Sequence, residues 1–134
     1  MSRIVTIGAA QLGPIQKEHT RESAVARLID LLEQAAGAGC DLVVFPELAL
    51  TTFFPRWFVD DITTADHWYE TSMPSPVTQP PFDRARELAI GFCLGYAELT
   101  TCLYLPDGRV AFVYKRPEIG HNDAFDAGGT KFEV

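Results

Sequence analysis

Cysteine and positive charge are both scarce in this sequence. Of its 134 residues, 3 are cysteine, 11 are lysine or arginine and 18 are aspartate or glutamate, so the formal net charge is −7. An odd number of cysteines without a C-x-x-C spacing argues against a disulfide framework and against a structural zinc site. The excess of negative charge argues against a nucleic acid or an anionic membrane as the binding partner.

Long apolar runs are lacking too. No segment approaches the roughly 20 consecutive apolar residues that a membrane-spanning helix needs. The apolar run near the N-terminus, residues 4–10, is too short for the hydrophobic region of a signal peptide. We therefore expect a soluble, cytoplasmic protein with reduced thiols. A chain of this size buries roughly two-thirds of its unfolded surface, so we expect one domain over residues 1–134.

The order of the apolar segments predicts an α/β fold. Residues 4–10 form a β-branched apolar run, and residues 41–46 form a second, continuously apolar run. Between them, Thr20 is a suitable N-cap, and apolar residues then recur at intervals of three or four positions up to Gly37. The pattern predicts strand, helix and strand. Because the second run has no polar alternation, we expect it to be covered on both faces, as parallel strands are.

The second half of the sequence predicts further elements. The proline pair at positions 80 and 81 suits the first turn of a helix. The turn at Asp107-Gly108 suits a hairpin. In chain order we expect a packed aromatic loop (Phe53, Phe54, Trp57 and Phe58), a short helix (64–71), a proline-rich connector (72–81), a helix, a strand (90–96), a hairpin (102–105 and 110–114) and a strand from Lys131. This last strand meets the end of the sequence at Val134, so we expect an interrupted domain.

Glu47 is the first candidate for a catalytic group. It follows the buried strand at residues 41–46, and open α/β sheets place ligands beyond the carboxyl ends of their strands. Beside Pro46 and the aromatic residues, its carboxylate is expected to be partly desolvated, which suits a general base. From position alone, a structural role such as capping a loop or pairing with Arg56 is equally open.

The unbroken string FPELALTTFFPRW, residues 45–57, resembles a motif of the N-carbamoyl-D-amino-acid amidohydrolases, a branch of the nitrilase (carbon–nitrogen hydrolase) superfamily. Shorter similar stretches are GPI at 13–15, YET at 69–71, MP at 73–74, GF at 91–92 and GYAEL at 95–99. The resemblance implies an α-β-β-α sandwich, of which this chain supplies the N-terminal part, and homo-oligomers built from such sandwiches.

The resemblance also implies a Cys-Glu-Lys mechanism, in which a thiolate attacks carbon, a glutamate moves protons and a lysine stabilises the oxyanion. Glu47 matches the family's glutamate. Lys115 matches its lysine, because it precedes Gly120-His121 at the family's spacing, although Tyr114 and residues 116–119 depart from the usual pattern. A solvated basic pair that ends a hairpin is the structural alternative for Lys115.

The nucleophile has no counterpart in the sequence, since the family's cysteine lies beyond the lysine and no cysteine follows Cys102. Cys40, Cys93 and Cys102 are interpreted as small packed side chains.

Three residues are candidates for contacting substrate. Arg56 and Trp57 could hold a substrate carboxylate against an aromatic wall, or simply pack in a salt bridge. His121 matches the family's Gly-His pair and could line the substrate pocket, or be an ordinary loop histidine. His19 and His67 have no neighbours that suggest a metal site and are interpreted as surface or capping residues.

Two functions remain open on the sequence. The first is an amidohydrolase that cleaves N-carbamoyl-D-amino acids, without a metal or organic cofactor, in a homo-oligomer or together with a complementary C-terminal chain. The second is a catalytically inactive, truncated homologue that acts as an oligomerising or binding module, which the absence of a downstream cysteine favours.

Overall fold

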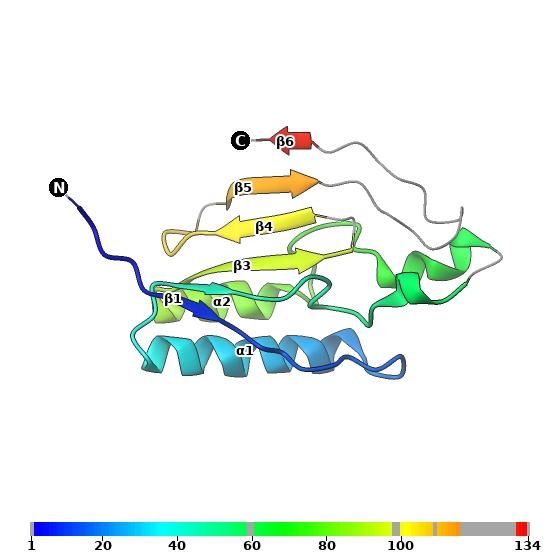
Figure 1. The fold of residues 1–134 in the computed structure, drawn as a ribbon, viewed down its shortest axis with the longest axis horizontal. Coiled ribbons are helices and arrows are strands. Elements are labelled where there is room, and N and C mark those ends of the chain that lie inside the picture. The colour runs from blue at the N-terminus through cyan, green and yellow to red at the C-terminus, as the bar shows by residue number, and fades with distance from the viewer. Residues whose placement is uncertain (1, 59–60, 98–99, 109, 116–130, 134) are drawn as a thin grey trace.

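The computed structural model describes residues 2–58, 61–97, 100–108, 110–115 and 131–133, and within them six strands form one sheet in the order β1-β2-β3-β4-β5-β6 (Figure 1). The elements are β1 (Ile7–Ala9), α1 (Arg21–Gly37), β2 (Leu42–Val44), the 3-10 helices η1 (Phe54–Arg56) and η2 (Ile62–Trp68), α2 (Gln79–Leu88), β3 (Gly91–Tyr96), β4 (Thr100–Tyr104), β5 (Val110–Lys115) and β6 (Lys131–Glu133).

The first three strands are parallel to one another, and β3 to β6 are antiparallel to their neighbours. Two successive crossovers in the same direction place α1 and α2 on one face of the sheet, where the helices lie side by side. The two helices contact each other, and Arg84 Nε of α2 lies 2.8 Å from Glu33 Oε1 of α1. The α/β fold predicted from the sequence is confirmed.

Helix α1 begins where the sequence predicts. The N–H of Ser23 donates to Thr20 Oγ1 at 3.2 Å, so the N-cap satisfies one of the free donors of the first turn. The predicted apolar stripe faces the sheet, with Val25, Leu28 and Leu32 buried.

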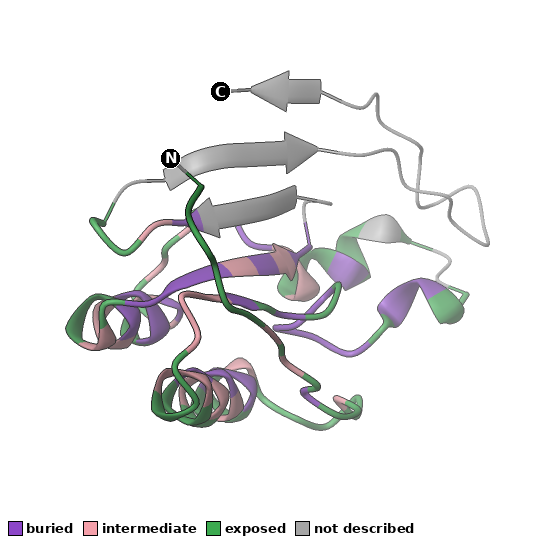
Figure 2. Cartoon of the chain, turned by 60° about the vertical axis from the view of Figure 1, so that its left-hand side comes forward, coloured by how far each residue is buried: buried purple, intermediate pink, exposed green. Residues whose placement is uncertain are grey.

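The core lies between the helices and the sheet. Phe92, Leu94 and Tyr96 alternate along β3 and are buried on its helix-facing side, and Val43 of β2 pairs with Phe92 in register. The Phe92 ring lies 5.0 Å from that of Phe82 on α2, centroid to centroid, in an edge-on arrangement. In Figure 2 the buried colour follows β3 and the inner sides of both helices.

The opposite face of the sheet is open at β1 and β2. Ile7 of β1 is 59% exposed and Val44 of β2 is 40% exposed, whereas Val43, which lies on the other face of the pleat from Val44, is fully buried. The expectation that residues 41–46 would be covered on both faces is therefore wrong for this chain. Within the residues that the structure describes, helices cover one face only, because both crossovers pass on the same side.

The aromatic segment that follows β2 is packed only in part. Phe54 is buried and stacks on Trp68 with ring centroids 5.0 Å apart. Phe53 and Phe58 are exposed, so their predicted burial is wrong. The helix expected at residues 64–71 is the 3-10 helix η2 instead, which begins earlier, after the N-cap Asp61.

The later strands follow the sequence prediction. Helix α2 has proline in its first turn, β4 and β5 form the predicted hairpin, and β6 begins at Lys131. Gly108 takes the positive φ of 90° that the hairpin turn requires. None of the helices in the described ranges is long and apolar enough to cross a membrane.

Ala89 has a backbone conformation that is unfavourable for a residue with a Cβ atom. It ends α2 in the left-handed conformation (φ 54°), and the N–H of Ile90 closes the helix on the carbonyl of Ala85 at 3.0 Å. We expect Ala89→Gly to raise the free energy of unfolding by about 0.5–1 kcal/mol, because glycine adopts this conformation without steric cost. Ala38→Gly is the matched control, since Ala38 ends α1 in the right-handed region (φ −85°) and should gain nothing. Urea denaturation compares the two; an equal gain in both variants would contradict the assignment.

Candidate active site

Glu47 lies three residues beyond the end of β2, in a loop at the carboxyl edge of the parallel strands. The prediction of its position relative to the sheet is confirmed. Its side chain is exposed, so the expected partial desolvation is wrong for this chain. The reason lies in the open face described above: within the described residues no second layer covers this edge.

The loop that carries Glu47 passes directly over β3 at Gly95. A Cβ atom at position 95 would lie 3.1 Å from the Cα of Glu47 and 3.3 Å from the carbonyl oxygen of Pro46. Both contacts are to backbone atoms, which cannot swing aside as a flexible side chain can. Glycine at position 95 therefore favours this close approach, because any Cβ there would require the backbone of the loop to shift.

Backbone hydrogen bonds fix the loop on both sides of Glu47. The N–H of Phe45 donates to the carbonyl of Cys93, and the N–H of Ala49 donates to the carbonyl of Gly95, each at 2.9 Å. Leu48 has a positive φ of 51°, an uncommon conformation that turns the chain between these two bonds. The backbone of Glu47 is thus held against β3 rather than left in a free loop.

The strand register relates Glu47 to Lys115. Gly95 pairs with Thr101 of β4, and Thr101 pairs with Tyr114 of β5, the residue before Lys115. Adjacent strands lie roughly 4.8 Å apart, so two intervals separate Gly95, beneath the Glu47 loop, from Tyr114 by about 10 Å. Strand β5 runs parallel to β3, so both residues lie at the same edge of the sheet.

Arg56 and Trp57 are brought together, as the sequence suggested. The guanidinium carbon of Arg56 lies 4.6 Å from the centroid of the Trp57 ring. A second cation, Lys17, lies with its Nζ 5.0 Å from the same ring. The sequence gives no sign of this second contact, because 40 positions separate Lys17 from Trp57. His121, the third predicted substrate contact, lies outside the described residues.

The two cysteines whose side chains are described do not resemble an activated nucleophile. Cys40 and Cys93 are both half-buried free thiols, and burial raises the pKa of the Cys93 thiol. A raised pKa disfavours the thiolate that nucleophilic catalysis requires.

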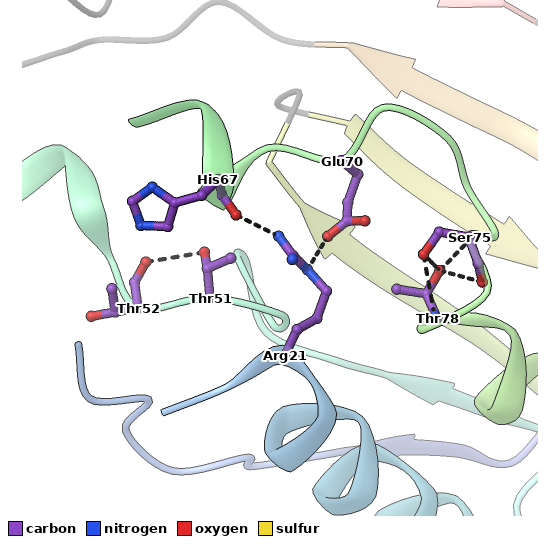
Figure 3. Close-up of polar contacts among 7 residues, drawn as sticks. All are labelled: Arg21, Thr51, Thr52, His67, Glu70, Ser75 and Thr78. Carbon is purple, nitrogen blue, oxygen red and sulfur yellow. Dashed lines mark hydrogen bonds and ion pairs between the residues drawn. The ribbon is translucent and has the colours of Figure 1, made fainter. Parts of the chain in front are cut away.

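A buried ion pair ties the N-terminus of α1 to the segment after η2. The Arg21 guanidinium pairs with the carboxylate of Glu70, which is 6% exposed, and Arg21 Nη2 also donates to the carbonyl of His67 at 3.0 Å (Figure 3). These contacts hold η2 and the residues after it against the start of α1, while the stacking of Trp68 on Phe54 joins η2 to the chain that follows Glu47.

A pocket of about 280 Å³ lies beside this ion pair. Its lining comes from residues 17, 19–21, 50–52 and 67–68. Sequence reasoning did not find it, because no local pattern links three segments so far apart. In the described part of the chain no group of three potential metal ligands is found.

Comparison with known protein families matches residues 6–118 to the family described as carbon-nitrogen hydrolase. The match covers most of the chain and includes β1 to β5, with Glu47 and Lys115 inside it.

Substitution of Gly95 tests the packing of the Glu47 loop. We expect Gly95→Ala to lower the free energy of unfolding by about 1–3 kcal/mol, because the added methyl group meets backbone atoms. Gly37→Ala is the matched control: a Cβ on this helical glycine meets nothing within 4 Å, so the variant should gain about 0.5–1 kcal/mol. Urea unfolding measures both. Equal stability of the two variants would show that the loop does not rest on Gly95.

The Cys93 thiol should react slowly in the folded protein. Burial raises its pKa, so at pH 8 we expect its alkylation by iodoacetamide to be at least about tenfold slower than in urea. Because the pKa is higher in the folded than in the unfolded state, the corresponding stability is complete below about pH 8.5 and is lost as the pH rises through the folded value. Cys93→Ser should remove this decline. Peptide mapping follows the alkylation; equal rates in the folded and the unfolded protein would refute the assignment.

Proposed function

The chain belongs to the carbon–nitrogen hydrolase family, and from that premise we propose that it supplies the glutamate and the lysine of an amidohydrolase site that acts on N-carbamoyl-D-amino acids. The observation that carries the proposal is the placement of Glu47 over Gly95, in register with the end of β5 where Lys115 lies. The string at residues 45–57 supports the choice of a carbamoyl amino acid among C–N substrates.

In this proposal each residue has one task. The Glu47 carboxylate takes the proton from an attacking cysteine thiol and returns it to the departing amine. The Lys115 ammonium stabilises the negative charge on oxygen when the carbamoyl carbon becomes tetrahedral. Water then hydrolyses the carbamoyl–cysteine thioester, and the overall reaction yields the free amino acid, carbon dioxide and ammonia. A backbone interval of about 10 Å suits a glutamate and a lysine that face one reacting carbon between them.

Arg56 and Trp57 form the proposed contact with the substrate carboxylate. A guanidinium binds a carboxylate in a bidentate manner, and the Trp57 ring 4.6 Å away limits the directions that Arg56 can take. His121 remains a proposed pocket residue on the basis of the Gly-His match alone.

The nucleophile is proposed to come from a complementary C-terminal chain, because Cys40 and Cys93 are half-buried thiols and burial raises the pKa of Cys93. The apolar residues on the open face, Ile7 and Val44, support a further layer of protein there. The same exposed face favours the second candidate function, an inactive homologue that self-associates or binds a partner through it. Assembly as a homo-oligomer and a cytoplasmic location belong to both proposals.

Ammonia release tests the proposed reaction. The purified chain is mixed with a polypeptide that carries the remainder of the fold and its cysteine, and an N-carbamoyl-D-amino acid is added. We expect activity in the mixture, a loss of about 10²–10⁴-fold with Glu47→Gln, and a loss of about 10²–10³-fold with Lys115→Met. A coupled ammonia assay gives the rates, and native mass spectrometry verifies that the two chains associate.

Two variants serve as controls for this experiment. Glu87→Gln removes an exposed carboxylate from α2, on the helix-covered side, and should retain activity. Lys131→Met removes the lysine that pairs with Lys115 across β5 and β6, and should also retain most of it. Activity that persists in Glu47→Gln, or that depends on Lys131 instead, would refute the residue assignment. Association without ammonia release would favour the inactive binding module.

A further inference from the structure

Arg21 holds both ends of a short aromatic segment. Its guanidinium pairs with the carboxylate of Glu70, and its Nη2 donates to the carbonyl of His67 at 3.0 Å (Figure 3). Between these two contacts in the sequence lie Trp68 and Tyr69. One side chain from the first turn of α1 therefore fixes the residues immediately before and immediately after the two aromatic rings.

The Arg21–Glu70 pair is largely removed from water. The Glu70 side chain is 6% exposed and the Arg21 side chain is 24% exposed. Just beyond the end of β3, the carbonyl of Ala97 accepts from the N–H of Glu70 at 3.4 Å. Removal of one partner from such a pair is costly, because the other charge is then left buried. The position of the aromatic segment relative to α1 and β3 thus depends on both charges.

The rings of this segment support Trp57. Trp68 stacks on Phe54 with ring centroids 5.0 Å apart, and on Trp57 with centroids 6.0 Å apart and an angle of 25° between the ring planes. Tyr69 contacts the Phe54 ring with centroids 5.3 Å apart. Phe54 is buried, and Trp57 and Trp68 pack against the cluster that contains it. The stacking on Trp68 therefore sets the direction of the Trp57 ring.

Trp57 in turn restricts Arg56. The guanidinium carbon of Arg56 lies 4.6 Å from the centroid of the Trp57 ring. Arg56 is exposed, and none of the ion pairs among the described residues includes it. Contact with the ring is thus the interaction that limits the directions of a long and otherwise flexible cation.

We propose that Arg21 and Glu70 are positioning residues for the contact between Arg56 and the substrate carboxylate. Direct contacts lead from the ion pair to the segment of Trp68, from Trp68 to Trp57, and from Trp57 to Arg56. A guanidinium that is already held in one direction loses less freedom when it binds a carboxylate, so the pair favours substrates that carry a carboxylate. This role rests on the proposed function, and neither Arg21 nor Glu70 touches the substrate in it.

Tryptophan spectroscopy tests the first part of this role without an assay of activity, because both tryptophans of the chain lie in the contact path. The variant is Arg21→Gln/Glu70→Gln, which leaves no buried charge unpaired. We expect it to lose most of the near-ultraviolet circular dichroism of the stacked Trp57 and Trp68 rings. Acrylamide should quench its fluorescence about twofold more strongly, because the local packing is loosened.

Arg84→Gln is the matched control. It removes an ion pair with Glu33 that joins α1 to α2, and it should leave both tryptophan signals unchanged. Far-ultraviolet circular dichroism verifies that both variants fold.

Steady-state kinetics in the two-chain mixture tests the link to the substrate. We expect Arg21→Gln/Glu70→Gln to raise KM for an N-carbamoyl-D-amino acid about tenfold with little change in kcat. KM for the methyl ester of the same compound, which has no carboxylate, should stay unchanged. A merely structural role would instead lower the apparent kcat for both substrates equally, because less of the protein would be folded.

Each failure gives a different result. Absence of ammonia release by the wild-type mixture refutes the proposed function, and with it the link to the substrate. The positioning role is overturned if the double variant keeps the wild-type tryptophan signals, or if Arg84→Gln changes them as much. It is also overturned if an active mixture shows the same KM with and without the ion pair, or an equal rise for the acid and its ester.

Discussion

The close approach of the Glu47 loop to Gly95 is the constraint on which the candidate active site depends. A side chain at position 95 of β3 would project into the space that the backbone of the Glu47 loop occupies. Because glycine has no side chain, the loop can lie against β3 at Gly95. Two backbone hydrogen bonds and the positive φ of Leu48 then fix the loop in that place. The proposed base is thus positioned by main-chain contacts. The strand pairing from β3 through β4 to β5 places Lys115 at the same edge of the sheet as this loop.

The sheet has two faces with different physical roles. On one face, α1 and α2 bury the aromatic and aliphatic side chains that supply the hydrophobic stabilisation of the chain. On the other, the loop of Glu47 crosses β3 and the apolar side chains of Ile7 and Val44 meet solvent. The hydrophobic core and the loop of the proposed catalytic glutamate therefore lie on opposite faces of the sheet. Glu47 follows β2, whose central residue Val43 is buried. Glu47 itself is exposed because its loop lies on the face of the sheet opposite the helices.

The Arg21–Glu70 pair lies where the start of α1 meets η2 and the residues that follow it. A buried ion pair costs desolvation on both partners, which their attraction and further hydrogen bonds offset only with good geometry. Here Arg21 meets both the Glu70 carboxylate and the carbonyl of His67, and so fastens η2 to the start of α1. One side of this junction is the packed cluster of Phe54 and Trp68, and the other is the polar pocket with Thr52.

Most helices and strands were predictable from local signals, because helix caps, apolar periodicity and turn residues act over a few positions: Thr20 begins α1, prolines begin α2, and Asp107-Gly108 joins β4 to β5. The position of Glu47 after a predicted strand made it a candidate, and resemblance to a family gave it a role and added Lys115. Only the tertiary structure decided which face of β2 is covered, that Phe53 and Phe58 are exposed, and that Gly95 supports the Glu47 loop. It alone assembled the pocket around Thr52. These features depend on contacts between segments tens of residues apart, and local propensity carries no information about such contacts.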